Sequence, residues 1–217
     1  MVKKRKFRQH IFFILLTLLL LAFVTGILLG RNLSNEKLDE ITIFIKNSEL
    51  NTESYLIEQE LIGTVDKNNC DLSKVRIDDI SYQLVLLGRE LTAADTKESI
   101  DKTEYSFLKL KYHLMQIKTY LLFYNLNQEC NIKSPVILYF YGDDGGLSQQ
   151  QGLILDKIVE DYDAKVFAIE YNYAKEIHFL ELHYNIKTTP SMIINYDKLI
   201  EGHADYETIK NELENQS

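Results

Sequence analysis

The sequence predicts an α/β domain at the carboxyl end of the chain, preceded by a transmembrane helix and an α-helical stalk. Three observations predict this arrangement. A long apolar run lies near the N-terminus, apolar residues recur at helical spacing over the next hundred positions, and short β-branched runs then alternate with helical segments. They divide the 217 residues into a basic tail (1–10), a transmembrane helix (11–30), a helical stalk (31–133) and a terminal domain (134–217).

The composition is that of a folded, acidic protein. It is 46% hydrophobic with two prolines, and its net charge is −8. Five cations and no acid lie within the first ten residues, so the rest of the chain is more acidic than the total indicates. An acidic surface repels phosphate backbones, and we therefore expect no nucleic-acid partner.

The apolar run from Ile11 to Leu29 contains no charged residue. At ~1.5 Å per residue it spans about 28 Å, close to the ~30 Å hydrocarbon core of a bilayer. It is longer than the apolar part of a cleavable signal peptide and lacks a small-residue cleavage site. The sequence therefore predicts a retained, single-pass signal-anchor in the cell membrane. The basic tail predicts a cytoplasmic N-terminus and an extracytoplasmic location for everything from Arg31 onward.

The stalk is predicted to contain helices over 35–62, 72–94 and 102–129. The polar stretch 47–54 interrupts the first pattern, which leaves one bent helix or two. Short connections predict an antiparallel bundle in which Cys70 and Cys130 reach the same end. In an oxidising compartment this favours a disulfide between them. Two alternatives stay open: two unrelated free cysteines, or a reactive pair that exchanges with partners.

The terminal domain is predicted to begin with a buried central strand over 136–141, followed by a glycine-rich turn over 142–146. A helix over 147–162 and a strand over 165–171 complete a parallel βαβ unit. A helix over 174–184, strands over 191–195 and 199–201, and a helix over 206–213 follow. This order places the first strand in the interior of the sheet.

Residues 134–214 resemble the thioredoxin family. The resemblance rests on PVILYFYG followed by a loop and LILDKIVEDY, and on YNIKTTPS, in which Thr189-Pro190 leads directly into an apolar strand. It covers about 80 residues. The resemblance implies a thioredoxin-like fold, with a cis peptide bond between Thr189 and Pro190.

The chain departs from that family at its reactive positions. The four positions of the Cys-x-x-Cys motif are occupied by Gly145, Gly146, Leu147 and Ser148. The acid and the lysine that assist thiol chemistry in redox members are replaced by Tyr139 and Ile169. Neither glycine nor serine can form a mixed disulfide, so no thioredoxin-type reductase activity is expected.

The resemblance still implies a peptide-binding shelf. In the family, the backbone before the cis-proline pairs with an extended peptide; here that residue is Thr189, facing Gly145 and Gly146. The alternative is a vestigial shelf on a domain that only caps the stalk. Together with the predicted topology, the shelf implies an extracytoplasmic protein or peptide as partner, and its identity is open.

We predict no metal and no cofactor. Asp143 and Asp144 lack the alternating ligand spacing of a calcium loop, and the histidines lack zinc-site spacing. The leading hypothesis is therefore a membrane-anchored, extracytoplasmic binding or scaffold module. One alternative is a thiol-disulfide exchange protein acting through Cys70 and Cys130, and another is an assembly role within a larger membrane complex.

Overall fold

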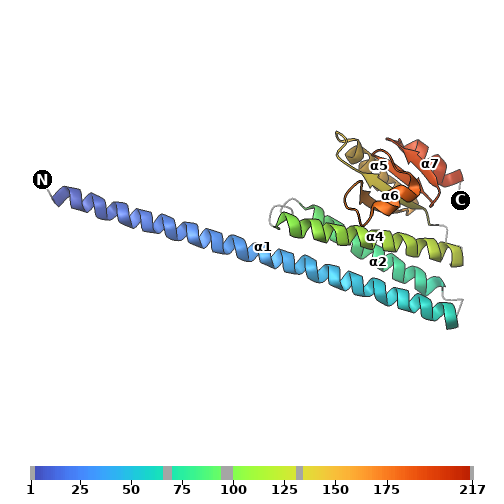
Figure 1. Ribbon diagram of the computed structural model, residues 1–217, viewed down its shortest axis with the longest axis horizontal. Coiled ribbons are helices and arrows are strands. Elements are labelled where there is room, and N and C mark those ends of the chain that lie inside the picture. The colour runs from blue at the N-terminus through green and yellow to red at the C-terminus, as the bar shows by residue number, and fades with distance from the viewer. Residues whose placement is uncertain (1–2, 66–69, 94–99, 131–133, 216–217) are drawn as a thin grey trace.

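The computed structural model describes residues 3–65, 70–93, 100–130 and 134–215 (Figure 1). Within the first helix, side chains are described for residues 12–27, 38–54, 56 and 57. The predicted basic tail at 1–10 and the end of the predicted span at 28–30 therefore lie outside the described side chains. Over the described part the chain forms a helical bundle joined to an α/β domain.

The bundle consists of α1 (Lys3–Val65), α2 (Cys70–Thr92) and α4 (Lys102–Cys130). The polar stretch 47–54 does not interrupt α1, which settles the open choice in favour of one helix. Its small polar residues continue the inward stripe of Ile41 and Ile45, because Ser48 and Thr52 are both buried. The Thr52 hydroxyl donates to the Ser48 carbonyl at 2.8 Å, so the polar group at Thr52 is satisfied within the helix.

The amino-terminal part of α1 extends away from the rest of the protein (Figure 1). Its large apolar side chains between Phe12 and Ile27 are exposed. In the part of the chain that the structure describes, no helix combines the length and the apolar content that crossing a membrane requires. The transmembrane helix at 11–30 accordingly stays a prediction.

Four strands form one mixed sheet within the described residues: β1 (Val136–Tyr141), β2 (Lys165–Glu170), β3 (Ser191–Ile194) and β4 (Lys198–Glu201). Their order is β2-β1-β3-β4, with β1 parallel to β2 and antiparallel to β3. The helix α5 (Leu147–Tyr162) connects β1 to β2, and the helices α6 (His178–Tyr184) and α7 (Tyr206–Asn215) follow β2 and β4. The predicted α/β class, the parallel βαβ unit and the interior position of β1 are confirmed.

The predicted helix over 174–184 was too long at its start, because α6 begins at His178. The preceding residues form a turn in which the Ile177 amide bonds to the Ala174 carbonyl at 3.2 Å. Ile177 is fully buried there, and it therefore anchors this turn rather than a helical stripe.

Helices cover both faces of the sheet. Alternate residues of β1 point to opposite faces: Leu138 and Phe140 share a core with the bundle helices and α6, whereas Ile137 and Tyr139 pack with α5 and α7. The core beneath the bundle is continuous from Ile45 in α1 to the sheet. The bundle and the sheet therefore support one another directly.

A glutamine of α4 completes the hydrogen bonding of β2. Gln116 is 3% exposed, and its side chain both donates to the Ala168 carbonyl and accepts from the Ala168 amide, each at 2.8 Å. β2 is an edge strand, so these backbone groups would otherwise lack partners in the sheet. The side-chain amide of Gln116 thus makes the two hydrogen bonds that a neighbouring strand would make, and it links α4 to β2.

Candidate functional site at the end of strand β1

The candidate site lies where β1 ends and β3 begins. These strands are antiparallel neighbours, with Phe140 opposite Ser191, so residues after β1 meet residues before β3. A Cβ placed on Gly142 would lie 2.9 Å from the Thr189 hydroxyl oxygen, which shows how closely the two segments approach. The Thr189–Pro190 peptide bond between them is cis. Two stretches almost fifty residues apart in sequence thus share one site.

Three hydrogen bonds link Ser148, in the first turn of α5, to the preceding turn. Its hydroxyl donates to a carboxylate oxygen of Asp144 and accepts from the Gly142 amide at 3.1 Å. Its backbone amide donates to the other Asp144 oxygen at 2.8 Å. Asp144 thereby satisfies a free amide at the start of α5, where negative charge is favoured by the helix dipole. The serine is buried and its hydroxyl is fully engaged.

The charge state of Asp144 argues against nucleophilic chemistry at Ser148. Partial desolvation raises the pKa of Asp144, but hydrogen bonds from Ser148 and from the Thr189 side chain outweigh it, and the pKa is lowered overall. A carboxylate with a lowered pKa is a weak proton acceptor, so it does not activate a hydroxyl as a base would. The Ser148 and Asp144 pair is a structural link between the turn and α5.

Tyr139 and Ile169, on β1 and β2, also have structural roles. The hydroxyl of Tyr139 donates to the Ser148 carbonyl at 2.7 Å, which ties β1 to α5. Burial raises the pKa of this tyrosine, so it keeps its proton at neutral pH. Ile169 is fully buried in the core beneath the bundle. Neither residue offers a group that exchanges protons at neutral pH.

Gly145 and Gly146 form the open side of the site. Their φ angles are +70° and +93°, and a Cβ on either would meet no atom within 4 Å. The described contacts of the Thr189 side chain are with Gly142 and Asp144 rather than with these two glycines. Leu147 follows them and is 44% exposed. The turn therefore leaves free space around Gly145 and Gly146, whereas Thr189 packs closely against Gly142.

Backbone conformation explains why glycine occupies position 146. We expect Gly146→Ala to lower the free energy of unfolding by about 1–2 kcal/mol, because its positive φ disfavours any Cβ although space is available. Gly152, within α5, also has free space but no positive φ. Gly152→Ala should raise stability by about 1 kcal/mol through helix propensity. Urea unfolding of both variants measures the contrast; equal effects would contradict it.

The two cysteines lie at the end of the bundle where α2 begins and α4 ends. Cys70 and Cys130 form a disulfide with a Cα–Cα distance of 5.7 Å, as predicted. The alternative of two unrelated free cysteines is therefore wrong. Within the described residues no group of three or more potential metal ligands is present.

Two features of the structure were not predicted from the sequence. The hydrogen bonds that the Tyr139 and Ser148 hydroxyls make were missed, whereas an acidic turn that caps the following helix, as Asp144 does here, is what the sequence predicts. The second feature is His113 of α4, which is fully buried and whose ring nitrogens have no hydrogen-bond partner among the described residues.

No protein-family model matches the chain, and no curated protein matches it significantly in sequence.

Proposed function

We propose that this chain is a membrane-anchored, thioredoxin-like protein that binds an extended segment of a protein partner outside the cytoplasm and performs no redox chemistry. The observation that carries the proposal is the open site where Thr189 meets the end of β1, which contains no sulfur. Its polar groups are bonded to one another, so the site offers shape and backbone rather than reactivity.

The sheet supports a thioredoxin-like fold. A parallel β1–α5–β2 unit followed by antiparallel β3 and β4, with helices on both faces, agrees with the resemblance over residues 134–214. The Thr189–Pro190 step lies at the start of β3, where the resemblance expects it.

The backbone at Thr189 supports peptide binding. Among the described residues, the contact that reaches its carbonyl is a weak one of 3.5 Å from the Thr188 hydroxyl. A carbonyl with so weak a partner can accept a hydrogen bond from an extended peptide. The free space at Gly145 and Gly146 gives such a peptide room on the neighbouring turn.

The apolar run at 11–29 supports the anchor. The large apolar side chains from Phe12 to Ile27 are between 45% and 70% exposed and occur on all sides of the helix. A helix that is apolar on every side needs an apolar environment around it. A bilayer supplies one, and the basic residues before the run favour a cytoplasmic N-terminus.

Photo-crosslinking on the full chain in native membranes tests the binding site. A photoreactive residue at Leu147 and another at Thr188 flank the site from two elements, and Leu153 is the matched control on α5 because it is also exposed. We expect the first two positions to capture the same protein and Leu153 to capture none. Equal capture at all three positions, or none at Leu147 and Thr188, would contradict the proposal.

Thiol-disulfide exchange through Cys70 and Cys130 is the competing function. The disulfide closes the helical bundle, and neither sulfur belongs to the β1–β3 site described above. We expect thiol titration of the native chain to find no free thiol, and we expect no reduction of insulin by the dithiothreitol-treated chain after removal of the reagent. If the treated chain does reduce insulin, and the Cys70→Ala substitution abolishes this activity, the exchange function is established instead.

A further inference from the structure

The bundle carries two rows of exposed apolar side chains, which we call the apolar rows. Each row repeats every seven residues. Ile43, Leu50 and Ile57 form the row on α1, and Phe107, Leu114 and Leu121 form the row on α4; all are 40–67% exposed. Single exposed apolar residues are common, but aligned rows at heptad spacing are typical of helices that pack against another helix.

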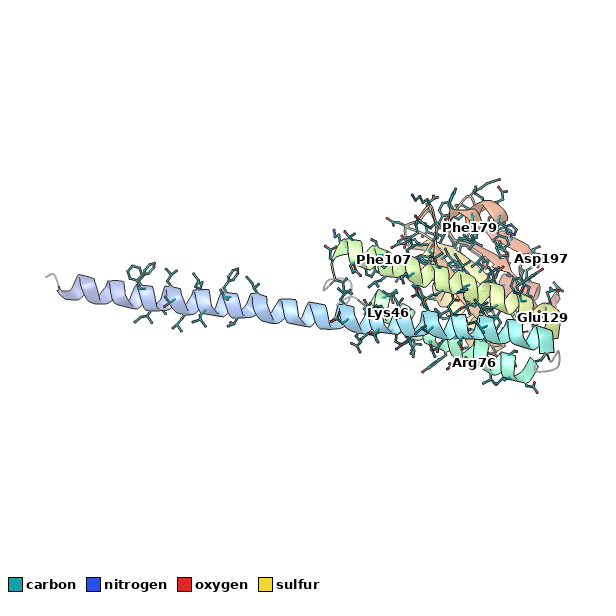
Figure 2. The ribbon with its side chains drawn as sticks, turned by 60° about the horizontal axis from the view of Figure 1, so that its bottom comes forward. Lys46, Arg76, Phe107, Glu129, Phe179 and Asp197 are labelled. Atoms are coloured by element: carbon teal, nitrogen blue, oxygen red, sulfur yellow. A yellow bond between two sulfur atoms is a disulfide. The ribbon has the colours of Figure 1, made fainter. Side chains whose placement is uncertain are left out.

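The two rows flank one groove. α1 and α4 run side by side in the same direction, with Lys46 and Phe107 toward one end of the bundle and Glu129 at the other (Figure 2). The groove between them has a volume of about 610 Å³, and Leu50, Leu114 and Met115 are among its lining residues. The α/β domain packs on another side of α4, which leaves the groove uncovered (Figure 1).

We propose that a second copy of this chain covers the apolar rows, related to the first by a two-fold axis parallel to α1 and α4. Such an axis preserves height along the helices. Because Leu50 and Leu114 line the groove at one level, Leu50 of each copy then meets Leu114 of the other. The contact uses the same surface on both copies, so it forms a dimer that adds no further copies. Two-fold dimers of this kind are the commonest class of homo-oligomer.

The charges beside the groove favour this pairing. α1 contributes Glu49 and Glu53 together with one cation, Lys46, and α4 contributes Lys111 and Lys118. Within one copy Lys111 Nζ lies 2.7 Å from Glu49, and Lys118 pairs with Glu53.

In the proposed dimer the acidic side of each α1 faces the basic side of the other copy's α4. All four side chains are 30–59% exposed, so their ion pairs can re-form across the interface. Pairing α1 with α1 would instead bring glutamate against glutamate, which is unfavourable. The charge pattern therefore favours an α1-to-α4 contact over an α1-to-α1 contact.

Crosslinking between two tagged populations of the full chain, mixed in mild detergent, tests the arrangement. One population carries Leu50→Cys and the other Leu114→Cys, and a short bismaleimide joins the new thiols without disturbing the native disulfide. The control mixture carries Leu153→Cys and Leu182→Cys on α5 and α6, which are at least as exposed as the test pair. We expect at least tenfold more crosslinked pair from the first mixture. Equal yields would overturn the proposal.

A substitution tests whether the apolar rows hold the dimer. Leu50→Glu should convert the full chain from dimer to monomer in size measurements, whereas Leu153→Glu should leave the dimer intact. The two leucines are 67% and 68% exposed, so the substitutions disturb folding equally little. A Leu50→Glu chain that stays dimeric would assign the contact to another surface. A wild-type chain that is monomeric at every concentration measured would refute a second copy as the occupant.

Discussion

Replacing Cys70 and Cys130 together with alanine is expected to lower the free energy of unfolding by about 4 kcal/mol. The disulfide closes a loop with a sequence separation of 60, and in the chain-entropy model such a cross-link restricts the unfolded chain by about that amount. It also holds the start of α2 against the end of α4, where both helices would otherwise fray. Urea unfolding of the full chain, followed by circular dichroism, measures the change.

The reduced wild-type chain is the control for this experiment. Dithiothreitol should destabilise the wild type to the level of the double alanine variant and leave that variant unaffected. A loss of less than 1 kcal/mol in the variant would mean that the bundle packing alone holds the two helix ends together.

The elements predicted most closely are those determined by local patterns. β1 and α5 occur at the predicted residues, because a run of β-branched and aromatic residues and a helical apolar stripe each report directly on burial. The polar stretch in α1 left the choice between one helix and two open, because Ser48 and Thr52 are polar but small enough to face inward between helices. Local polarity does not reveal such a packing arrangement.

The candidate site was less accessible to sequence reasoning than the fold. The sequence indicated which positions lack sulfur, but it did not reveal that Ser148 is engaged by Asp144 and Gly142. The contact between Gln116 and β2 joins positions 52 residues apart and follows no periodic pattern. Such hydrogen bonds depend on how elements approach in space, and a single sequence carries little information on that.

Acid is expected to destabilise the protein through His113. This histidine is fully buried between α4 and the aromatic rings of Tyr112, Tyr141 and Tyr173, with centroid distances of 5.1–6.5 Å. Burial lowers its pKa to about 3, and repulsion from Lys109 adds to this effect. The backbone of Ala168 opposes the shift only in part, because no hydrogen bond of good geometry reaches the ring.

The direction of the pH dependence follows from these values. Below pH 6.5 the unfolded chain protonates His113, whereas the folded chain does not until about pH 3, so stability is lost as the pH falls through this window. Between pH 7.5 and pH 4.5 the loss begins near pH 6.5 and so accumulates over about two pH units. At 1.36 kcal/mol per unit, this residue alone then costs about 3 kcal/mol of stability. Thermal and urea unfolding across that range should show the decline.

His113→Met separates this effect from the titration of carboxylates. The variant should lose about 3 kcal/mol less than the wild type between pH 7.5 and pH 4.5. At neutral pH it should be at least as stable, because two buried nitrogens without partners are removed. His203→Met, at an exposed position, is the matched control and should follow the wild type. If His113→Met keeps the full acid sensitivity, then groups other than this buried ring cause it.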